Sequence, residues 1–477
     1  MSTRPATPEA TFDVIVIGGG PGGEASAAYL ARAGARVAVV ERELVGGVCP
    51  YWGCMPTKAL LRPPQVIAEA QRVPGAAEAV SGPLDVAAAL ARRDEIVGHL
   101  SDDRHADRLQ HIGATLYRGH GRLTGERTVR VTASDDTTVE LVATRAVILC
   151  PGSRASLLPI DGLADARPWT NREATQVTDP PDRLLVFGGG VVGVELAQAI
   201  AALGTAVTIV EPADQLLGRE EPEAAQLVQD ALERMGVTIH LGYEATRVDR
   251  LPDGTVRVTL ADDAGTLEAD ELLVAAGRQG NVEDLGLETV GVTATADGTI
   301  EVCDCMYVET APWLYVVGDA NGRAQLTHAA AYQARVAARN ALGIETHCVS
   351  DDVGAPRVIY TEPHVAAVGH TLASARDAGL DVRAFDRDPQ RLPGASFVGR
   401  GTDGFARIIV DVETRCVVGA TFAAPDIAEL LHAATIAIVG EVTVDRLRHC
   451  VPAFPTRSEI WVKLLDLVDA DPAFAES

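Results

Sequence analysis

A glycine-rich loop between two apolar runs constrains the fold more than any other feature of this sequence, because it occurs twice. In the first copy, the apolar run 12–17 is followed by a loop with the spacing G-x-G-x-x-G, whose glycines are Gly18, Gly20 and Gly23. A helical pattern and a second apolar run then lead to Glu41. This order predicts a strand–helix–strand unit that binds a dinucleotide, with the pyrophosphate at the helix N-terminus and a ribose at Glu41.

The second copy has the same order of elements. Its loop glycines are Gly188, Gly190 and Gly193, and its second strand ends at Glu211. The copies start 170 residues apart, so the repeated object is a domain and not a solenoid unit. Two such units predict two dinucleotides, a flavin and a nicotinamide. Glu211 would accept a ribose 2′-hydroxyl and repel a 2′-phosphate, which favours NAD(H), while Arg219 farther on leaves NADP(H) open.

The segments that follow the two copies also resemble each other. Residues 114–149 and 237–275 carry short alternating strands with turn signals, which predict small antiparallel meanders. Each leads through an apolar strand to a glycine, Gly152 and Gly277. A further apolar strand ends at Asp319, which we expect to bind a ribityl or ribose hydroxyl, with a turn residue as the alternative.

The remaining part of the chain carries no third nucleotide loop. An alanine-rich helix opens at His328, whose helix N-terminus could face an electron-rich ring, although a histidine there is more often structural. From about residue 351 a mixture of strands and helices predicts an α+β domain.

Two cysteines, Cys49 and Cys54, lie four residues apart in the run 46–58, which reads GGVCPYWGCMPTK. We interpret them as a redox-active pair at the start of a helix, where unpaired N–H groups favour a thiolate. A zinc site would need about two more ligands nearby, so we expect no metal, and an inert core pair is the other alternative. Lys58 is one of only two lysines in an arginine-rich chain, which indicates a functional ammonium.

Length, net charge and cysteine content exclude several classes of protein. A chain of 477 residues predicts about three domains. Its net charge of −25 argues against nucleic acid or an anionic membrane as partner, and no apolar run is long enough to span a bilayer. Residues 1–11 predict a frayed tail and not a signal peptide. Eight scattered cysteines are unlike a secreted disulfide scaffold, so we expect a cytoplasmic protein.

Together these motifs resemble the class I pyridine nucleotide–disulfide oxidoreductases, which include glutathione reductase, dihydrolipoamide dehydrogenase and mercuric reductase. The resemblance covers about residues 12–465 and includes the terminal P-T-x-x-E at 455–459. It implies an α/β fold with two Rossmann-like dinucleotide-binding domains, antiparallel meanders and a C-terminal α+β dimerisation domain. FAD would bind to residues 12–155 and 283–348, NAD(P)H to residues 156–282, and residues 349–477 would form a homodimer.

The resemblance also implies residue roles. Hydride would pass from the nicotinamide to the flavin, and the electrons would then reach the disulfide. Cys54 would be the flavin-side thiolate and Cys49 the interchange thiol that attacks the substrate. Lys58 and Glu195 match the pair that sits beside the flavin. Val191 stands where glutathione reductases carry a gating tyrosine.

The C-terminal motif departs from the family. Disulfide reductases of this class carry a histidine just before P-T-x-x-E, held by the glutamate that is Glu459 here; in this chain Phe454 takes the place of the histidine. Phenylalanine cannot transfer a proton, and such general catalysis contributes roughly 10²–10⁴-fold. Mercuric reductases lack this histidine too, but they carry a vicinal cysteine pair near the C-terminus, and no cysteine follows Cys450 here.

The stretch between the two cysteines is also unusual, because it contains Tyr51 and Trp52. An aromatic wall of these residues and Phe454 would suit a planar organic substrate, and simple packing is the alternative. We expect the other cysteines to be core residues, with Cys303 and Cys305 sharing one face of a strand and Cys450 as a candidate third exchanging thiol.

These residues predict an FAD enzyme that moves electrons between NAD(P)H and a small thiol or disulfide other than glutathione. Three alternatives stay open: a dithiol oxidase that delivers electrons to NAD⁺ or O₂, a metal-ion or quinone reductase, and a flavin-binding redox sensor without catalysis.

Overall fold

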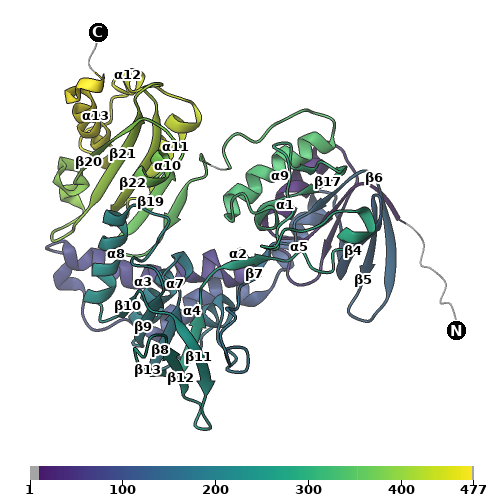
Figure 1. Cartoon of the computed structure of the whole chain (residues 1–477), viewed down its shortest axis with the longest axis horizontal. Coiled ribbons are helices and arrows are strands. Elements are labelled where there is room, and N and C mark those ends of the chain that lie inside the picture. The colour runs from purple at the N-terminus through teal and green to yellow at the C-terminus, as the bar shows by residue number, and fades with distance from the viewer. Residues whose placement is uncertain (1–9, 352, 475–477) are drawn as a thin grey trace. The chain divides into compact units, whose positions relative to one another are not determined.

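The computed structural model describes residues 10–351 and 353–474, which form two compact units (Figure 1). The first unit contains residues 10–55, 94–154 and 278–351, and the second contains residues 56–93, 155–277 and 353–474. Residues 1–9 of the predicted N-terminal tail lie outside the described residues. Ala10 and Thr11 correct that prediction, because they pair with β6 as the first residues of β1.

The first unit is built on a mainly parallel sheet with the strand order β16-β17-β6-β1-β2-β3. Apolar residues of α1, α5 and α9 cover one face, and the meander strands β4 and β5 with residues 282–300 cover the other. This double cover explains why residues 14–17 of β1 and 37–40 of β2 are all apolar. Its elements are β1 Ala10–Ile17, α1 Pro21–Arg32, β2 Val37–Glu41, α2 Val48–Trp52, η2 Gly98–Leu100, α5 Asp103–His111, β3 Thr115–Arg118, β4 His120–Gly125, β5 Thr128–Thr132, β6 Thr138–Leu149, β7 Ser153–Ala155, β15 Arg278–Gly280, η3 Leu287–Val290, β16 Tyr307–Val308, β17 Ala311–Val316, η4 Gly318–Asn321 and α9 Thr327–Ala341.

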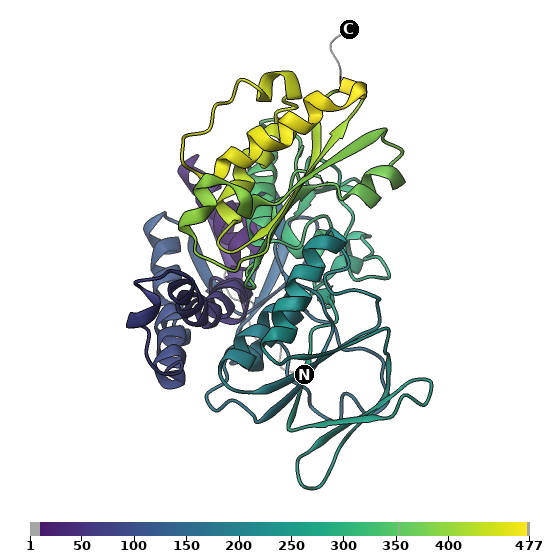
Figure 2. The same ribbon diagram turned by 90° about the vertical axis from the view of Figure 1, so that its left-hand side faces the viewer.

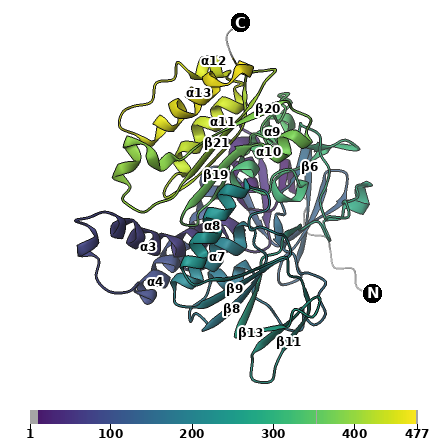
Figure 3. The same ribbon diagram turned by 60° about the vertical axis from the view of Figure 1, so that its left-hand side comes forward.

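The second unit contains the second copy of the nucleotide fold. Its parallel sheet has the order β10-β9-β8-β14, and α7 and α8 pack against it (Figure 3). A separate antiparallel sheet has the order β11-β12-β13. The elements of this part are α3 Cys54–Arg72, η1 Ala77–Ala79, α4 Val86–Ile96, α6 Asn171–Thr175, β8 Arg183–Phe187, α7 Val191–Ala202, β9 Ala206–Glu211, α8 Pro222–Arg234, β10 Thr238–Leu241, β11 Ala245–Arg250, β12 Val256–Leu260, β13 Thr266–Ala269 and β14 Glu271–Val274.

The predicted duplication of α/β domains is confirmed, and the predicted meanders need the same correction in both copies. Only the middle of each segment is an antiparallel meander, formed by β4 to β6 and by β11 to β13. The preceding strands β3 and β10 instead extend the parallel sheets beside β2 and β9. Short strands in both arrangements show similar local patterns, so partner choice was not visible in the sequence.

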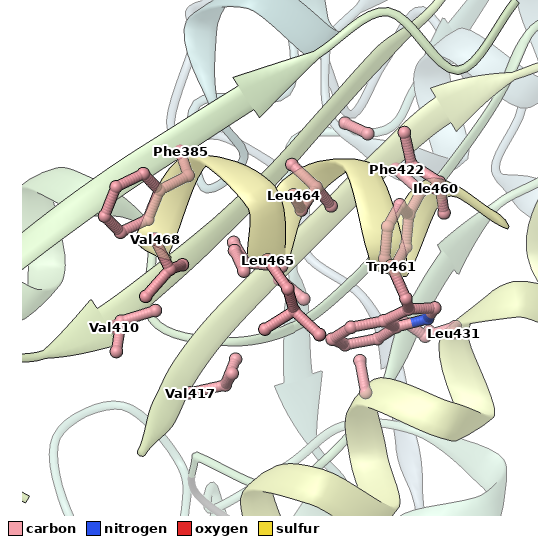
Figure 4. Packing of buried hydrophobic residues seen from close by; sticks show 14 of the residues in the cluster. Phe385, Val410, Val417, Phe422, Leu431, Ile460, Trp461, Leu464, Leu465 and Val468 are labelled. Carbon is pink, nitrogen blue, oxygen red and sulfur yellow. The ribbon is translucent and has the colours of Figure 1, made fainter. Parts of the chain in front are cut away.

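The C-terminal part of the second unit is α+β, as predicted. A five-stranded antiparallel sheet has the order β18-β19-β22-β21-β20, and α13 lies against it in yellow in Figure 2. The core between them includes Phe385, Phe422, Trp461 and Leu464 (Figure 4). The elements are β18 Arg357–Ile359, β19 His364–Gly369, α10 Leu372–Asp377, β20 Val382–Arg387, η5 Pro389–Arg391, η6 Pro393–Phe397, β21 Phe405–Asp411, β22 Val417–Ala424, η7 Ala428–Leu430, α11 Leu431–Val439, α12 Val444–Leu447, η8 Arg457–Glu459, α13 Ile460–Ala470 and η9 Pro472–Phe474.

Candidate functional site

The first glycine loop joins β1 to α1 and leaves no room for a side chain at two positions. Gly18 has a φ of +102°, and a Cβ there would lie 2.0 Å from the carbonyl oxygen of the residue that follows β6. A Cβ on Gly23 would lie 1.9 Å from the Gly18 carbonyl oxygen. Glu41 accepts hydrogen bonds from the Gly19 and Glu43 amides at 2.6 and 2.7 Å. Burial raises the pKa of Glu41, and these two hydrogen bonds oppose the rise.

The second loop repeats this geometry with different residues. Gly188 has a φ of +105°, and a Cβ on Gly193 would again lie 1.9 Å from the carbonyl oxygen that starts the loop. Glu211 accepts hydrogen bonds from the Gly189 and Ala213 amides at 2.6 and 2.9 Å. The close packing of helix on turn and the anchoring of the acid are therefore common to both copies.

The helix that follows each loop begins with open space before it. Gly20 and Gly190 are the N-cap residues of α1 and α7, with φ values of −72° and −75°. Among the described residues, a Cβ at Gly190 would meet no heavy atom within 4 Å, and the nearest one to a Cβ at Gly20 is the Gly47 Cα at 3.9 Å. The unpaired N–H groups of each first turn face a space that a phosphate can occupy, so both loops fit a dinucleotide.

A second part of the first unit holds Asp319, in η4. The Asp319 carboxylate is hydrogen-bonded by the Ser153 hydroxyl, and Arg278 donates to the Ser153 hydroxyl and carbonyl at 2.7 and 2.8 Å. Gly152 precedes the serine with a φ of +68°, and Gly277 precedes the arginine with a φ of +133°. The serine and arginine fix the acid at the end of β17, and their partnership with it was not visible in the sequence.

The structure divides the cysteine pair between two helices. Cys49 is the second residue of α2 and Cys54 the first residue of α3, with Gly53 between them at φ −129° and ψ −111°. The Cys54 Sγ lies 3.5 Å from the Oγ1 of Thr327, the first residue of α9. His328 is the second residue of α9. Cys54 therefore lies at the N-termini of two helices, whose partial positive charges favour a thiolate.

Tyr51 and Trp52 belong to the interior of the first unit. Their exposed fractions are 2% and 8%, and the Tyr51 hydroxyl donates to the Val45 carbonyl at 3.0 Å. The Val45 amide in turn donates to Asp102 at 2.7 Å. Burial, followed by the charge of Asp102, raises the pKa of Tyr51 to about 12. The packing alternative therefore holds for these two aromatics, and they do not form an exposed wall.

An ion pair in the second unit joins two predicted site residues. The Lys58 Nζ donates to the Glu195 carboxylate at 2.6 Å, and the Tyr360 amide donates to the other oxygen of that carboxylate at 2.8 Å. The ammonium also lies 4.9 Å from the centre of the Tyr360 ring. Glu195 is only 3% exposed, so the pair is largely withdrawn from water. Tyr360 was missed because nothing in its local sequence points to a site.

The C-terminal motif exposes its aromatic residue and buries one carboxylate oxygen of its half-buried acid. Phe454 is 75% exposed, whereas the Glu459 Oε2 is buried and has no hydrogen-bond partner among the described residues. The arginine between them, Arg457, donates to the Asp426 carbonyl at 2.6 Å, and burial lowers its pKa. Cys450 is exposed.

Cys303 and Cys305 lie in a turn and not on a strand, which corrects the prediction for them. The Met306 amide donates to the Cys303 carbonyl at 2.9 Å, closing a four-residue turn.

A duplicated dinucleotide fold, a cysteine pair at helix N-termini and a C-terminal antiparallel sheet are together the architecture of a disulfide oxidoreductase with two dinucleotide sites. The profile described as pyridine nucleotide-disulphide oxidoreductase matches residues 12–334, and the dimerisation domain of the same family matches residues 355–465. The chain belongs to the pyridine nucleotide-disulphide oxidoreductase family. Members of this family are FAD-dependent oxidoreductases that act on sulfur groups and use NAD(P)H as electron donor.

Several relatives match over almost the whole chain. The dihydrolipoyl dehydrogenase of Thermus scotoductus is 34% identical over 454 residues, covering 94% of this chain and 95% of the relative. A mercuric reductase of Staphylococcus aureus is 28% identical, covering 94% of this chain and 81% of the relative. The Cu(II) complex of the HOCl-induced flavoprotein disulfide reductase RclA from Escherichia coli is similar in structure, with a TM-score of 0.83, 26% identity and coverage of 96% and 99%.

In the part of the chain that the structure describes, no helix combines the length and the apolar character that crossing a membrane requires.

Proposed function

We propose that this protein transfers electrons between NADH and a small disulfide or related acceptor through FAD and the Cys49–Cys54 pair. The position of Cys54 carries the proposal: its sulfur lies at the first turn of α3 and 3.5 Å from Thr327 at the first turn of α9. Two helix N-termini at one sulfur would hold it as a thiolate, which is the form that reacts in thiol–disulfide exchange.

Each of the two nucleotide loops is assigned one cofactor. We assign FAD to residues 12–155 and 283–348 and NAD(P)H to residues 156–282. When bound, FAD supplies a two-electron carrier between the nicotinamide and the thiols. The FAD residues are Gly18, Gly20, Gly23, Glu41, Gly152, Asp319 and His328, and the NAD(P)H residues are Gly188, Gly190, Gly193, Glu211 and Gly277.

The preference for NADH rests on the surroundings of Glu211. The Glu211 carboxylate is held by the Gly189 and Ala213 amides, so it is fixed where a ribose would lie. A fixed carboxylate binds a 2′-hydroxyl and repels a 2′-phosphate.

The sulfur atoms of Cys49 and Cys54 carry out the thiol–disulfide exchange. The Cys49 thiolate attacks a substrate disulfide, forming a mixed disulfide and releasing one substrate thiolate. Cys54 then attacks the Cys49 sulfur, which forms the Cys49–Cys54 disulfide and releases the second thiolate. Lys58 lies one turn after Cys54 on the same face of α3, and Glu195 holds its ammonium. We assign this pair to the flavin side of the reaction.

The absence of a histidine at position 454 restricts the acceptor. A thiolate leaving group needs a proton unless its own pKa is low, and Phe454 cannot supply one. We therefore propose acceptors whose leaving thiols have low pKa values, such as aromatic disulfides, in place of glutathione.

Metal-ion reduction is the second candidate function. Reduction of a metal ion needs no protonated leaving thiol, so it tolerates Phe454. Similarity to a mercuric reductase of Staphylococcus aureus and to the Cu(II) complex of Escherichia coli RclA supports it.

We further propose a homodimer formed by residues 349–477. Large apolar side chains are exposed on this part of the second unit, with Val451 at 89%, Phe454 at 75% and Ile436 at 58%. A second copy of the chain would bury them. We also propose a cytoplasmic location, on the scattered cysteines alone.

Anaerobic titration of the purified flavoprotein with NADH tests the main proposal. A thiolate beside an oxidised flavin produces a long-wavelength absorbance band, so we expect this band at two electrons per FAD and its loss in Cys54→Ser. Bleaching of the flavin without the band in the unmodified protein would refute exchange between FAD and the cysteine pair. Parallel assays with an aromatic disulfide and with Cu(II) then separate the two candidate acceptors.

A further inference from the structure

A second pair of thiols lies in the turn that precedes β16. Cys303 and Cys305 are the first and third residues of this turn, which the Met306 amide closes, and both are half-buried. Residues so placed have Cα atoms about 5–6 Å apart, within the range of roughly 4.4–6.8 Å that a disulfide spans. The pKa of Cys305 is raised by burial first and then by the charge and hydrogen bond of Cys303, so the two thiols interact.

A second segment brings a histidine to this turn. The His347 Nδ1 lies 3.4 Å from the Cys305 Sγ. The other ring nitrogen, Nε2, lies 3.4 Å from the Glu345 carboxylate. A thiol within reach of an imidazole can pass its proton to the ring, which forms the nucleophilic thiolate.

One backbone hydrogen bond and two from an asparagine side chain hold the two segments together. The Cys348 amide donates to the Asp304 carbonyl at 2.7 Å. The Asn340 side chain donates to the Cys305 carbonyl at 3.1 Å and to the Thr346 carbonyl at 2.6 Å. The backbone on both sides of His347 is therefore held next to the cysteine turn.

The turn itself is also anchored to the sheet of the first unit. The Val316 amide of β17 donates to the Met306 carbonyl at 3.0 Å. The Asp304 side chain, between the two cysteines, forms an ion pair with Arg323 at 2.9 Å. Thiols on such a fixed turn are pre-positioned for reaction with each other.

We propose that Cys303 and Cys305 form a second redox dithiol, which hydroperoxides oxidise to a disulfide with His347 as the base. His347 takes the Cys305 proton, and the thiolate attacks the peroxide, breaking the O–O bond. The products are a Cys305 sulfenic acid and an alcohol, which receives the proton from the imidazolium. The Cys303 thiol then attacks the sulfenic sulfur, forming the S–S bond and releasing water. The two thiols supply both electrons, so the net change is one peroxide reduced to an alcohol and water.

This site does not depend on the proposed function of Cys49 and Cys54, and trypsin separates the two pairs. Cleavage at arginine and lysine releases residues 43–58 with only Cys49 and Cys54, and residues 279–323 with only Cys303 and Cys305. Each peptide therefore reports on one pair, and the first peptide is an internal control for the second.

The test treats the reduced, FAD-loaded full chain with cumene hydroperoxide, alkylates the remaining thiols and analyses the tryptic peptides by mass spectrometry. We expect the 279–323 peptide to lose two hydrogens and to escape alkylation. His347→Asn should slow this reaction about tenfold or more at neutral pH. The matched control His449→Asn, which changes an exposed histidine beside Cys450, should leave the rate unchanged.

Two further variants test the order of the steps without requiring a disulfide. In Cys303→Ser, a sulfenic acid should accumulate on Cys305 and react with dimedone. In Cys305→Ser, dimedone should not label Cys303. Full alkylation of the 279–323 peptide after peroxide treatment would overturn the proposed site. An unchanged rate in His347→Asn would overturn the role of the histidine.

Discussion

The Gly193→Ala substitution is expected to weaken NADH binding about a hundredfold or more while FAD stays bound. The new Cβ would lie 1.9 Å from the Gly188 carbonyl oxygen, whereas real Cβ contacts are essentially never under 3.0 Å. The loop or the helix must therefore move by at least about 1 Å, because the interior is close-packed. An N–H···O hydrogen bond of about 2.9 Å does not survive such a displacement.

The expected loss of affinity follows from the hydrogen bonds to the phosphates. A hydrogen bond to a charged group contributes about 1.5–3 kcal/mol. Losing two of them raises the Kd for NADH about a hundredfold or more, since each 1.4 kcal/mol is about a factor of ten. Calorimetric titration of the FAD-loaded protein with NADH measures this Kd, and the visible flavin absorbance per protein reports the FAD content.

Two matched variants show whether the loss of NADH affinity comes from the steric contact at Gly193 or from a general effect on folding. Gly23→Ala makes the same 1.9 Å contact with Gly18 in the first loop, and we expect it to lose FAD. Gly190→Ala meets no described heavy atom within 4 Å, so it should leave folding intact and weaken NADH binding only by occupying the phosphate space. An unchanged Kd in Gly193→Ala would refute the steric reasoning. Loss of FAD from Gly193→Ala with retention in Gly23→Ala would show that the cofactor assignments are reversed.

Three other predictions concern the second unit. Lys58→Met leaves the buried Glu195 carboxylate with the Tyr360 amide as a donor, and should lower the free energy of unfolding by about 2–3 kcal/mol in denaturant titrations; adding Glu195→Gln should recover part of this loss, and strictly additive costs would contradict the pairing. Phe454→His should raise turnover about tenfold or more with disulfides whose leaving thiols have ordinary pKa values, and little with aromatic disulfides; an equal gain on both would contradict the proton-transfer argument. Burial lowers the pKa of His364 to about 4 from its ordinary 6.5, so between these two pH values the unfolded chain binds a proton that the folded chain does not. The free energy of unfolding should therefore fall as the pH drops from 6.5 to about 4. His364→Gln should flatten this dependence of the unfolding free energy on pH, and an unchanged dependence would contradict the reasoning.

The duplicated nucleotide fold could be predicted because its signals are local. The turn at Gly18 and Gly188 needs positive φ, and the contact of Gly23 or Gly193 with it spans five residues. The strand residues that lead into each loop, 14–17 and 184–187, are all apolar because both faces of each parallel sheet are covered. Such short-range constraints leave a readable spacing of glycines and apolar runs.

The predictions for the small strands and for the cysteine turn failed for one reason. β3 and β10 join the parallel sheets and not the meanders, and Cys303 and Cys305 lie in a turn. A run of three to five residues does not determine which strand it will pair with. Alternation of two cysteines in a turn also looks the same in the sequence as alternation of side chains along a strand. Pairing depends on the rest of the fold.

The sequence by itself determined the family and the two glycine-rich loops with Glu41 and Glu211, and it carries the prediction that Cys49 and Cys54 are the reactive pair. Only the tertiary structure decided that Cys54 meets Thr327, that Tyr360 completes the Lys58 pair, and that Arg278 and Ser153 hold Asp319. These contacts join residues more than 100 positions apart, so no local pattern encodes them. They arise because the fold brings together elements that are remote in sequence. Cys54 and Thr327 each begin a helix, Tyr360 follows a strand of the antiparallel sheet, and Asp319 follows a strand of the parallel sheet.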